Sequence, residues 1–99
     1  MTDMEMLELA AKAAGYEVRS DGEGGLTIPT RRGASREWNP LTDDGDALRL
    51  AVTIGFVVEP GKCWHSHYGP AFGEDVLMGV MAATRRAIVR AAAQIGAQM

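Results

Sequence analysis

The chain has 99 residues, which suits one small domain with a single core, and its 46% hydrophobic and 23% charged residues are ordinary for a globular protein. The formal net charge of −3 excludes a strong overall positive field of the kind that holds nucleic acid. One cysteine, Cys63, excludes an intrachain disulfide and favours a reducing cytoplasm. The acidic first residues and the short apolar runs predict neither a signal peptide nor a membrane span.

The first predicted element is a helix over residues 2–15. Thr2 followed by Glu5 is typical of a capping box, in which each residue satisfies a backbone N–H of the other. Gly15 can adopt the left-handed conformation that ends a helix. The residues at helical spacing, which we expect on the buried face, are Met6, Leu9, Ala10 and Ala13.

A β-hairpin is predicted next. Residues 16–19 alternate between apolar and charged side chains, as a half-buried strand does, and residues 26–29 form a second apolar run. The glycine-rich residues 21–25 between them are typical of a turn. Residues 30–37 have no clear period, so we predict a surface loop there.

A second helix is predicted from Asn39 to Gly55. Asn39 is a strong N-cap residue type and Pro40 suits the first helical position, although Thr42 is an alternative cap. The helix dipole favours negative charge near this end, which accounts for three acidic residues, Asp43, Asp44 and Asp46. The expected buried stripe consists of Leu41, Gly45, Leu48 and Val52.

The second half of the chain predicts another hairpin and a long helix. Residues 56–59 and 62–68 alternate as strands do, and a Pro-Gly turn separates them. Residues 69–73 are expected to form a loop and residues 74–96 a helix, with Gly79 as an alternative start. The expected buried stripe of this helix consists of Val80, Ala83, Ala87, Ile88, Ala91 and Ile95.

The predicted element order is α-β-β-α-β-β-α. It indicates a single α+β domain over residues 1–99, in which an antiparallel four-stranded sheet of two hairpins packs with three helices.

Two runs of the sequence resemble a known family. Residues 38–52, WNPLTDDGDALRLAV, are similar to a segment of small proteins from tailed phages and prophages of proteobacteria, and residues 83–93, ATRRAIVRAAA, resemble the C-terminal helix of these proteins. The family is grouped as a phage α/β/α sandwich domain and has no assigned activity. The resemblance implies a phage origin and this fold type. It does not extend to residues 60–75, and it supplies no catalytic residues.

A metal site is one hypothesis for the second hairpin. Cys63, His65 and His67 alternate along a predicted strand, so they share one face, and thiolate and imidazole are zinc ligands. A fourth ligand would have to come from elsewhere, such as Glu59 or Glu74. A strand that displays polar residues to solvent has the same pattern. As a nucleophile and base, Cys63 and His65 would lie ~6.5 Å apart without an orienting third group, which argues against catalysis.

The aspartates in the first two turns of the second predicted helix could also be interpreted as calcium ligands. Their spacing departs from that of an EF-hand, which places acids at alternate positions and closes with a glutamate. The favourable field at a helix start explains them without a ligand. We therefore predict that residues 43–46 serve to begin the helix.

A second hypothesis is that the chain binds nucleic acid through its arginines. The candidates for contacting phosphate are Arg31, Arg32, Arg36, Arg85, Arg86 and Arg90. The acidic total charge argues against strong binding, and surface charges are usually only solvated.

Aromatic residues near the second hairpin are the candidates for a protein interface. These are Trp64, Tyr68 and Phe72. Trp38 precedes the middle helix, where we expect it to pack on Leu41 or Thr42 and close the core. No phosphate loop, catalytic triad or pocket-forming carboxylate pair is present, so we favour binding over catalysis and expect no cofactor.

The favoured hypothesis is a phage or prophage accessory protein that binds a phage or host protein in the bacterial cytoplasm. The alternatives are a nucleic-acid-associated protein that uses the arginines and a zinc protein that uses Cys63, His65 and His67. The sequence leaves the oligomeric state open.

Overall fold

The computed structural model of the chain describes residues 1–30, 32–65, 69–72 and 79–99, and of Phe72 it describes the backbone alone. The helices are α1 (Asp3–Ala14), α2 (Asp44–Ile54) and α3 (Val80–Ala97). Sheet A consists of β1 (Arg19–Ser20), β2 (Leu26–Pro29) and β3 (Ser35–Trp38). Sheet B consists of β4 (Val57–Glu59), β5 (Lys62–His65) and β6 (Gly69–Phe72).

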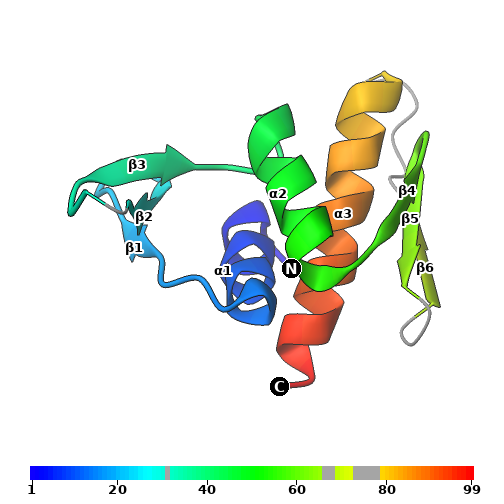
Figure 1. Cartoon of the computed structure of the whole chain (residues 1–99), viewed down its shortest axis with the longest axis horizontal. Coiled ribbons are helices and arrows are strands. Elements are labelled where there is room, and N and C mark those ends of the chain that lie inside the picture. Colours follow the sequence, from blue (N-terminus) through cyan, green and yellow to red (C-terminus); the bar gives the residue numbers. More distant parts are fainter. Residues whose placement is uncertain (31, 66–68, 73–78) are drawn as a thin grey trace.

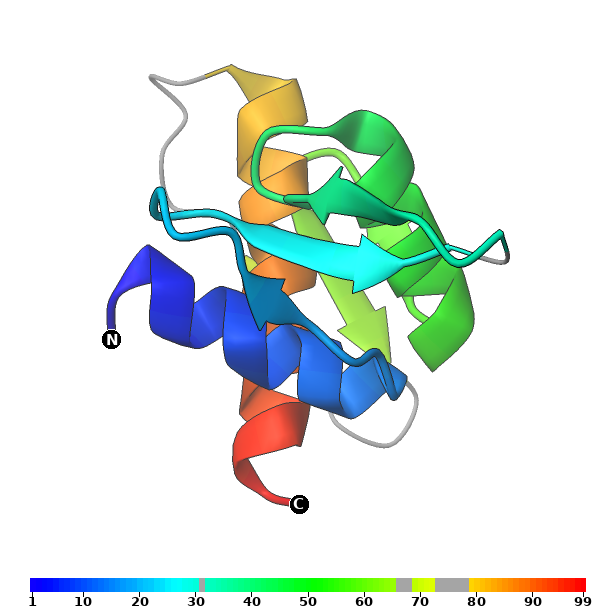
Figure 2. The same ribbon diagram turned by 90° about the vertical axis from the view of Figure 1, so that its left-hand side faces the viewer.

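The helices lie between the two sheets (Figure 1). Sheet B packs on α3, which contacts all three of its strands, while α1 and α2 pack on the other side of α3 and sheet A lies beyond them. In Figure 2, α1 crosses α3 at a steep angle behind sheet A. None of the helices in the described ranges combines the length and the apolar character that a membrane span needs.

The predicted α+β class is confirmed, but the predicted single four-stranded sheet is wrong. Each hairpin gains a third antiparallel strand from a segment that we expected to be a loop. β3 comes from residues 30–37 and Trp38, and β6 from residues 69–73. Each hairpin thus completes a small sheet with its neighbour in sequence, and α2 carries the chain from one side of the helices to the other.

The sequence did not predict β3, because three of its four residues are polar and they show no alternation of apolar and polar side chains. Residues Arg36 and Trp38 lie on the inner face, while Ser35 and Glu37 are exposed. The backbone pairs Trp38 with Leu26 and Arg36 with Ile28, so an arginine occupies a position that a strand normally gives to an apolar residue.

The ends of α1 agree with the prediction. Thr2 is the N-cap, and its hydroxyl accepts a hydrogen bond from the Glu5 N–H at 3.1 Å. Gly15 ends the helix with a φ of +77°. The predicted stripe is wrong in part, because Leu9 and Ala13 are only half-buried. The buried residues are Met6, Leu7, Ala10 and Ala11.

The start of α2 differs from the prediction by four residues. The Asn39 side chain accepts a hydrogen bond from the Leu41 N–H, and the Asn39 carbonyl accepts one from the Asp43 N–H. Asn39 and Pro40 therefore open a turn, and Asp43 is the N-cap. Gly55 ends the helix as predicted, with a φ of +92°.

The predicted buried stripe of α2 is wrong. Leu48 is 62% exposed and Val52 is 71% exposed. The buried residues are Asp46, Ala47, Leu50 and Ala51. An aspartate thus belongs to the inner face, and small alanines let α2 approach its neighbours closely.

α3 follows the alternative start, with Gly79 as its N-cap, while the predicted residues 74–78 lie outside the described ranges. Gly96 does not end the helix, which continues to Ala97. Val80 is 54% exposed, contrary to prediction. The buried positions that were predicted correctly are Ala83, Ala87, Ile88, Ala91 and Ile95.

The core combines a few large side chains with many alanines. The largest fully buried side chains are Trp38, Leu50, Val89, Pro40 and Cys63. The Trp38 ring meets Tyr16 edge to face, with ring centroids 5.9 Å apart, so it closes the core as expected, although from the end of β3.

Candidate functional site

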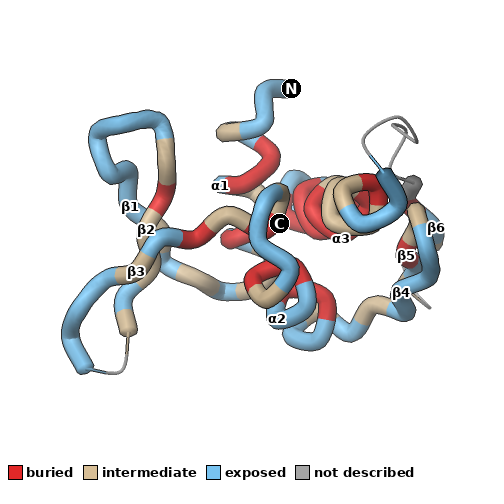
Figure 3. The backbone as a smooth tube through the Cα atoms, turned by 90° about the horizontal axis from the view of Figure 1, so that it is seen from above, coloured by how far each residue is buried: buried red, intermediate tan, exposed pale blue. Residues whose placement is uncertain are grey.

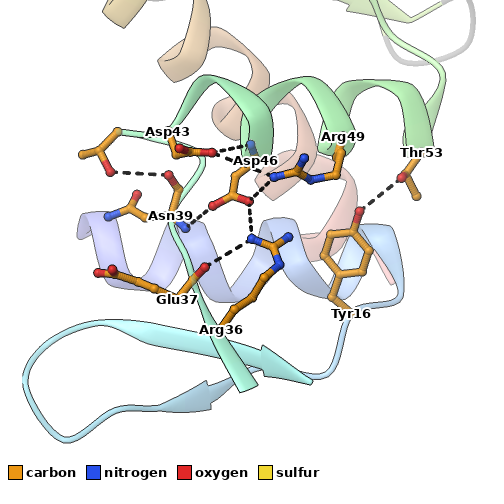
Figure 4. Close-up of polar contacts among 9 residues, drawn as sticks. Tyr16, Arg36, Glu37, Asn39, Asp43, Asp46, Arg49 and Thr53 are labelled. Atoms are coloured by element: carbon orange, nitrogen blue, oxygen red, sulfur yellow. Dashed lines mark hydrogen bonds and ion pairs between the residues drawn. The ribbon is translucent and has the colours of Figure 1, made fainter. Parts of the chain in front are cut away.

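A buried carboxylate ties sheet A to α2 (Figure 4). Asp46 is 3% exposed. Its Oδ1 accepts hydrogen bonds from Arg36 Nη1 and Arg49 Nη2, each at 2.9 Å, and its Oδ2 accepts one from the Asn39 N–H at 2.9 Å. Arg36 comes from β3, Arg49 from α2 and Asn39 from the connection between them. One side chain therefore fixes three segments.

The electrostatics of Asp46 favour its charged form. Burial alone would raise the pKa of this carboxyl group. The Asn39 N–H and the guanidinium groups of Arg36 and Arg49 outweigh that effect and lower the pKa below its usual value. Asp46 is therefore ionised at neutral pH.

The other two aspartates of the cluster act at the helix start. Asp43 Oδ2 accepts a hydrogen bond from the Asp46 N–H at 2.8 Å, as an N-cap does. Asp44 pairs with Arg85 of α3 at 2.6 Å. The cluster therefore begins α2, as predicted. The inward role of Asp46 was missed, although Arg49 three residues later was a signal for an ion pair.

A polar cavity of about 360 Å³ lies beside this network. Its lining residues are Arg36, Glu37, Asn39, Thr42, Asp43, Asp46 and Arg49. The charged groups at its base bond to one another, and no buried polar side-chain atom in the described ranges lacks a hydrogen-bond partner. The network is therefore complete as architecture and has no buried group waiting for a ligand.

Most of the candidate arginines bond to groups of the chain itself. Besides Arg36, Arg85 donates to the Leu41 carbonyl and to Asp44, and Arg86 pairs with Asp3 at 3.3 Å. Arg90 also has an interaction within the chain. Of the remaining candidates, Arg32 is exposed in the turn after β2, and Arg31 lies outside the described ranges.

Cys63 lies on the inner face of sheet B. It is fully buried, and its Sγ donates to the Ala87 carbonyl of α3 at 3.3 Å. Burial raises the pKa of this thiol to about 11, which disfavours the thiolate that a zinc ligand or a nucleophile requires. His65 is half-buried, with its ring edge to face with Phe56.

The predicted metal triplet is described only in part, because His67 lies outside the described ranges. Where the structure describes the chain, no three His, Cys, Asp or Glu side chains gather closely enough to hold a metal ion.

The native thiol of Cys63 is expected to resist labelling. A soluble disulfide reagent at mildly alkaline pH should react with the native protein only as fast as the protein opens, because the thiol is buried and protonated. The absorbance of the thiolate that the reagent releases measures the rate of labelling. The same protein in denaturant should react completely and fast. Rapid labelling of the folded chain would contradict this prediction.

The outer face of sheet B carries exposed apolar side chains. Val57, Trp64 and Pro70 lie opposite one another on β4, β5 and β6, so they form one row across the sheet. Because Cys63 points to α3, its neighbour Trp64 points away from the core. Trp64 is 39% exposed and Val57 is 43% exposed.

The next row on this face is charged. Glu59 and Lys62 pair at 2.9 Å, and the backbone of Phe72 lies opposite Lys62. The Phe72 side chain and the whole of Tyr68 lie outside the description. Of the three predicted interface residues, Trp64 is therefore the one whose exposed position is described.

Comparisons with known proteins found no family model, no curated protein and no solved structure that matches this chain.

Proposed function

We propose that this chain is a phage or prophage accessory protein that acts in the host cytoplasm by binding another protein through the outer face of sheet B. Trp64 is the anchor, and Tyr68 and Phe72 are further contact candidates. The phage origin is supported by the resemblance of residues 38–52 and 83–93 to small phage proteins.

One observation carries the binding proposal. The row of Val57, Trp64 and Pro70 places an exposed indole between two other apolar side chains, on a face that no described element covers. Large aromatic side chains in such positions contribute much of the affinity at protein interfaces. The neighbouring Glu59–Lys62 pair supplies the polar rim that interfaces usually have.

Truncation of Trp64 is expected to abolish capture of the partner. The tagged protein should retain a specific protein from the lysate of a phage-carrying bacterium, and Trp64→Ala should lose it, because a hot-spot residue contributes about 2 kcal/mol or more. With the purified partner, titration calorimetry should then show about thirtyfold weaker binding.

Val80→Ala is the control, since Val80 is an exposed apolar residue of α3, the helix that packs on the opposite face of sheet B from Trp64. Equal capture by wild type and Trp64→Ala would refute the proposal. A mobility shift of DNA or RNA at low salt would instead favour the nucleic-acid alternative.

A further inference from the structure

Three of the four sheet edges carry features that block the addition of another strand. β1 has two residues, which is too short to template a partner. On β3, the Glu37 carbonyl already accepts a hydrogen bond from Arg36 at 3.3 Å. β6 contains Pro70, which has no N–H to offer.

The direction in which Pro70 faces follows from the register. Glu59 and Lys62 flank a two-residue turn, so they form a hydrogen-bonded pair, and such pairs alternate along an antiparallel ladder. Trp64 therefore bonds to β4, and its pair with Pro70 on β6 is a non-hydrogen-bonded one. The proline nitrogen thus faces the free edge of β6.

β4 is the edge that lacks such a device in the described part of the chain. Val58 pairs with Cys63 at a non-hydrogen-bonded position, so its N–H and C=O point outward from the sheet. Val57 and Val58 are 43% and 40% exposed. Lys62 pairs with Glu59 and offsets its negative charge, so Glu59 repels an approaching strand only weakly. Figure 3 shows β4 exposed along its length at the side of the molecule.

We propose that two copies of this chain associate by pairing their β4 strands antiparallel about Val58. A two-fold axis through this pair lets each Val58 N–H donate to the Val58 carbonyl of the other copy, so one outward donor and one outward acceptor satisfy each other. The two β4 side chains of Val58 then meet on the inner face. The two copies of sheet B become one continuous sheet, and both Trp64 side chains remain on its outer face.

The exposed flank of α2 supplies further area for this contact. A three-residue strand buries far less than the roughly 1,200 Å² of a specific interface. Leu48 and Val52 are exposed on a flank of α2 that lies away from Asp46, the residue through which α2 contacts β3 of sheet A. In Figure 3, α2 and β4 lie on the same side of the molecule.

Two substitutions of Val58 test the pairing in sedimentation experiments from micromolar to millimolar protein. Val58→Pro removes the outward N–H and leaves the ladder to β5 intact, so self-association should weaken at least about tenfold. Val58→Lys keeps the N–H but places two like charges opposite each other, so a similar loss is expected even if the proline variant folds poorly.

Ala34→Lys is the control, because it adds the same charge in the exposed turn of sheet A at the far end of the molecule. It should leave the dimerisation constant unchanged. In a mixture of differently labelled copies, NMR should also detect intermolecular contacts between Val58 amides. A wild type that stays monomeric at millimolar concentration, or variants of Val58 that associate as the wild type does, would overturn the proposal.

Discussion

Replacing Gly96 by alanine is expected to destabilise the protein by about 3 kcal/mol, the upper range for overpacking in a core. Gly96 is buried in α3 where α1 crosses it, and a methyl group there would overlap the backbone carbonyl of Leu9, whose carbon would lie 2.8 Å away. Backbone cannot move aside as a flexible side chain does. The two helices would therefore have to separate. Chemical denaturation measures the loss, which should lower the midpoint and leave unchanged the dependence of the unfolding free energy on denaturant concentration.

Gly45→Ala is the matched control, because Gly45 also lies inside a helix. The groups nearest to its added methyl are the ends of the Arg49 and Asp43 side chains, at 3.1 and 3.2 Å, so only side chains, and no backbone, would have to move by a few tenths of an ångström. Alanine is the better helix former by up to about 1 kcal/mol, so this variant should be neutral or slightly more stable. If both substitutions stabilise the protein, the contact between Gly96 and Leu9 is not as close as described.

Replacing Asp46 by alanine is expected to cost about 2–3 kcal/mol at neutral pH. The change leaves the Asn39 N–H without its partner and removes two charge-assisted hydrogen bonds. Because the guanidinium groups of Arg36 and Arg49 remain partly exposed and can turn to water, the cost stays below that of breaking a fully buried ion pair. Urea denaturation of both proteins measures the difference.

The contribution of Asp46 is expected to vanish in acid. Its pKa is lowered by folding, so the stability that it supplies is complete above the unfolded value of about 4 and is lost as the pH falls through the lower folded value. The difference between wild type and Asp46→Asn should therefore shrink as the pH drops below about 4. A difference that stays constant into strong acid would show that the charge of Asp46 does not matter.

Local signals in the sequence predicted three helix ends correctly, whereas the start of α2 lies four residues later than expected. Thr2 and Gly15 cap α1 and Gly55 caps α2 as expected, because capping depends on hydrogen bonds and φ values within a few residues. Gly96 shows the limit of this reasoning. It looked like another helix end, but its missing side chain serves a contact with a segment more than eighty residues away.

The choice of the inner face of α2 could not be made from periodicity. The helix has two apolar flanks, one with Leu48 and Val52 and one with Ala47, Leu50 and Ala51. Hydrophobicity favoured the flank with the larger residues. The flank that is buried in the structure is the one whose alanines allow close packing. Asp46 is buried on this flank as well, because Arg36 of β3 forms a hydrogen bond with its carboxylate. Such a pairing between distant segments leaves no mark on local spacing.

Only part of the candidate site could be predicted, because the rest depends on contacts between segments that are separated in the sequence. Trp64 was recognisable as a possible interface residue from its type, and the alternation of β5 placed Cys63 and Trp64 on opposite faces. The row that joins Trp64 to Val57 and Pro70 depends on the registers of two strand pairs, and residues 69–73 were not predicted as a strand at all.

The central position of α3 has a consequence for how the protein is made. This helix contacts α1, α2 and every strand of sheet B, and Asp3 near the start of the chain pairs with Arg86 on it. Until residues 80–97 have left the ribosome, the nascent α1 and α2 lack the main surface on which they bury their apolar sides. Core formation during synthesis is therefore delayed until this last helix is available, and the earlier segments depend on it to escape aggregation.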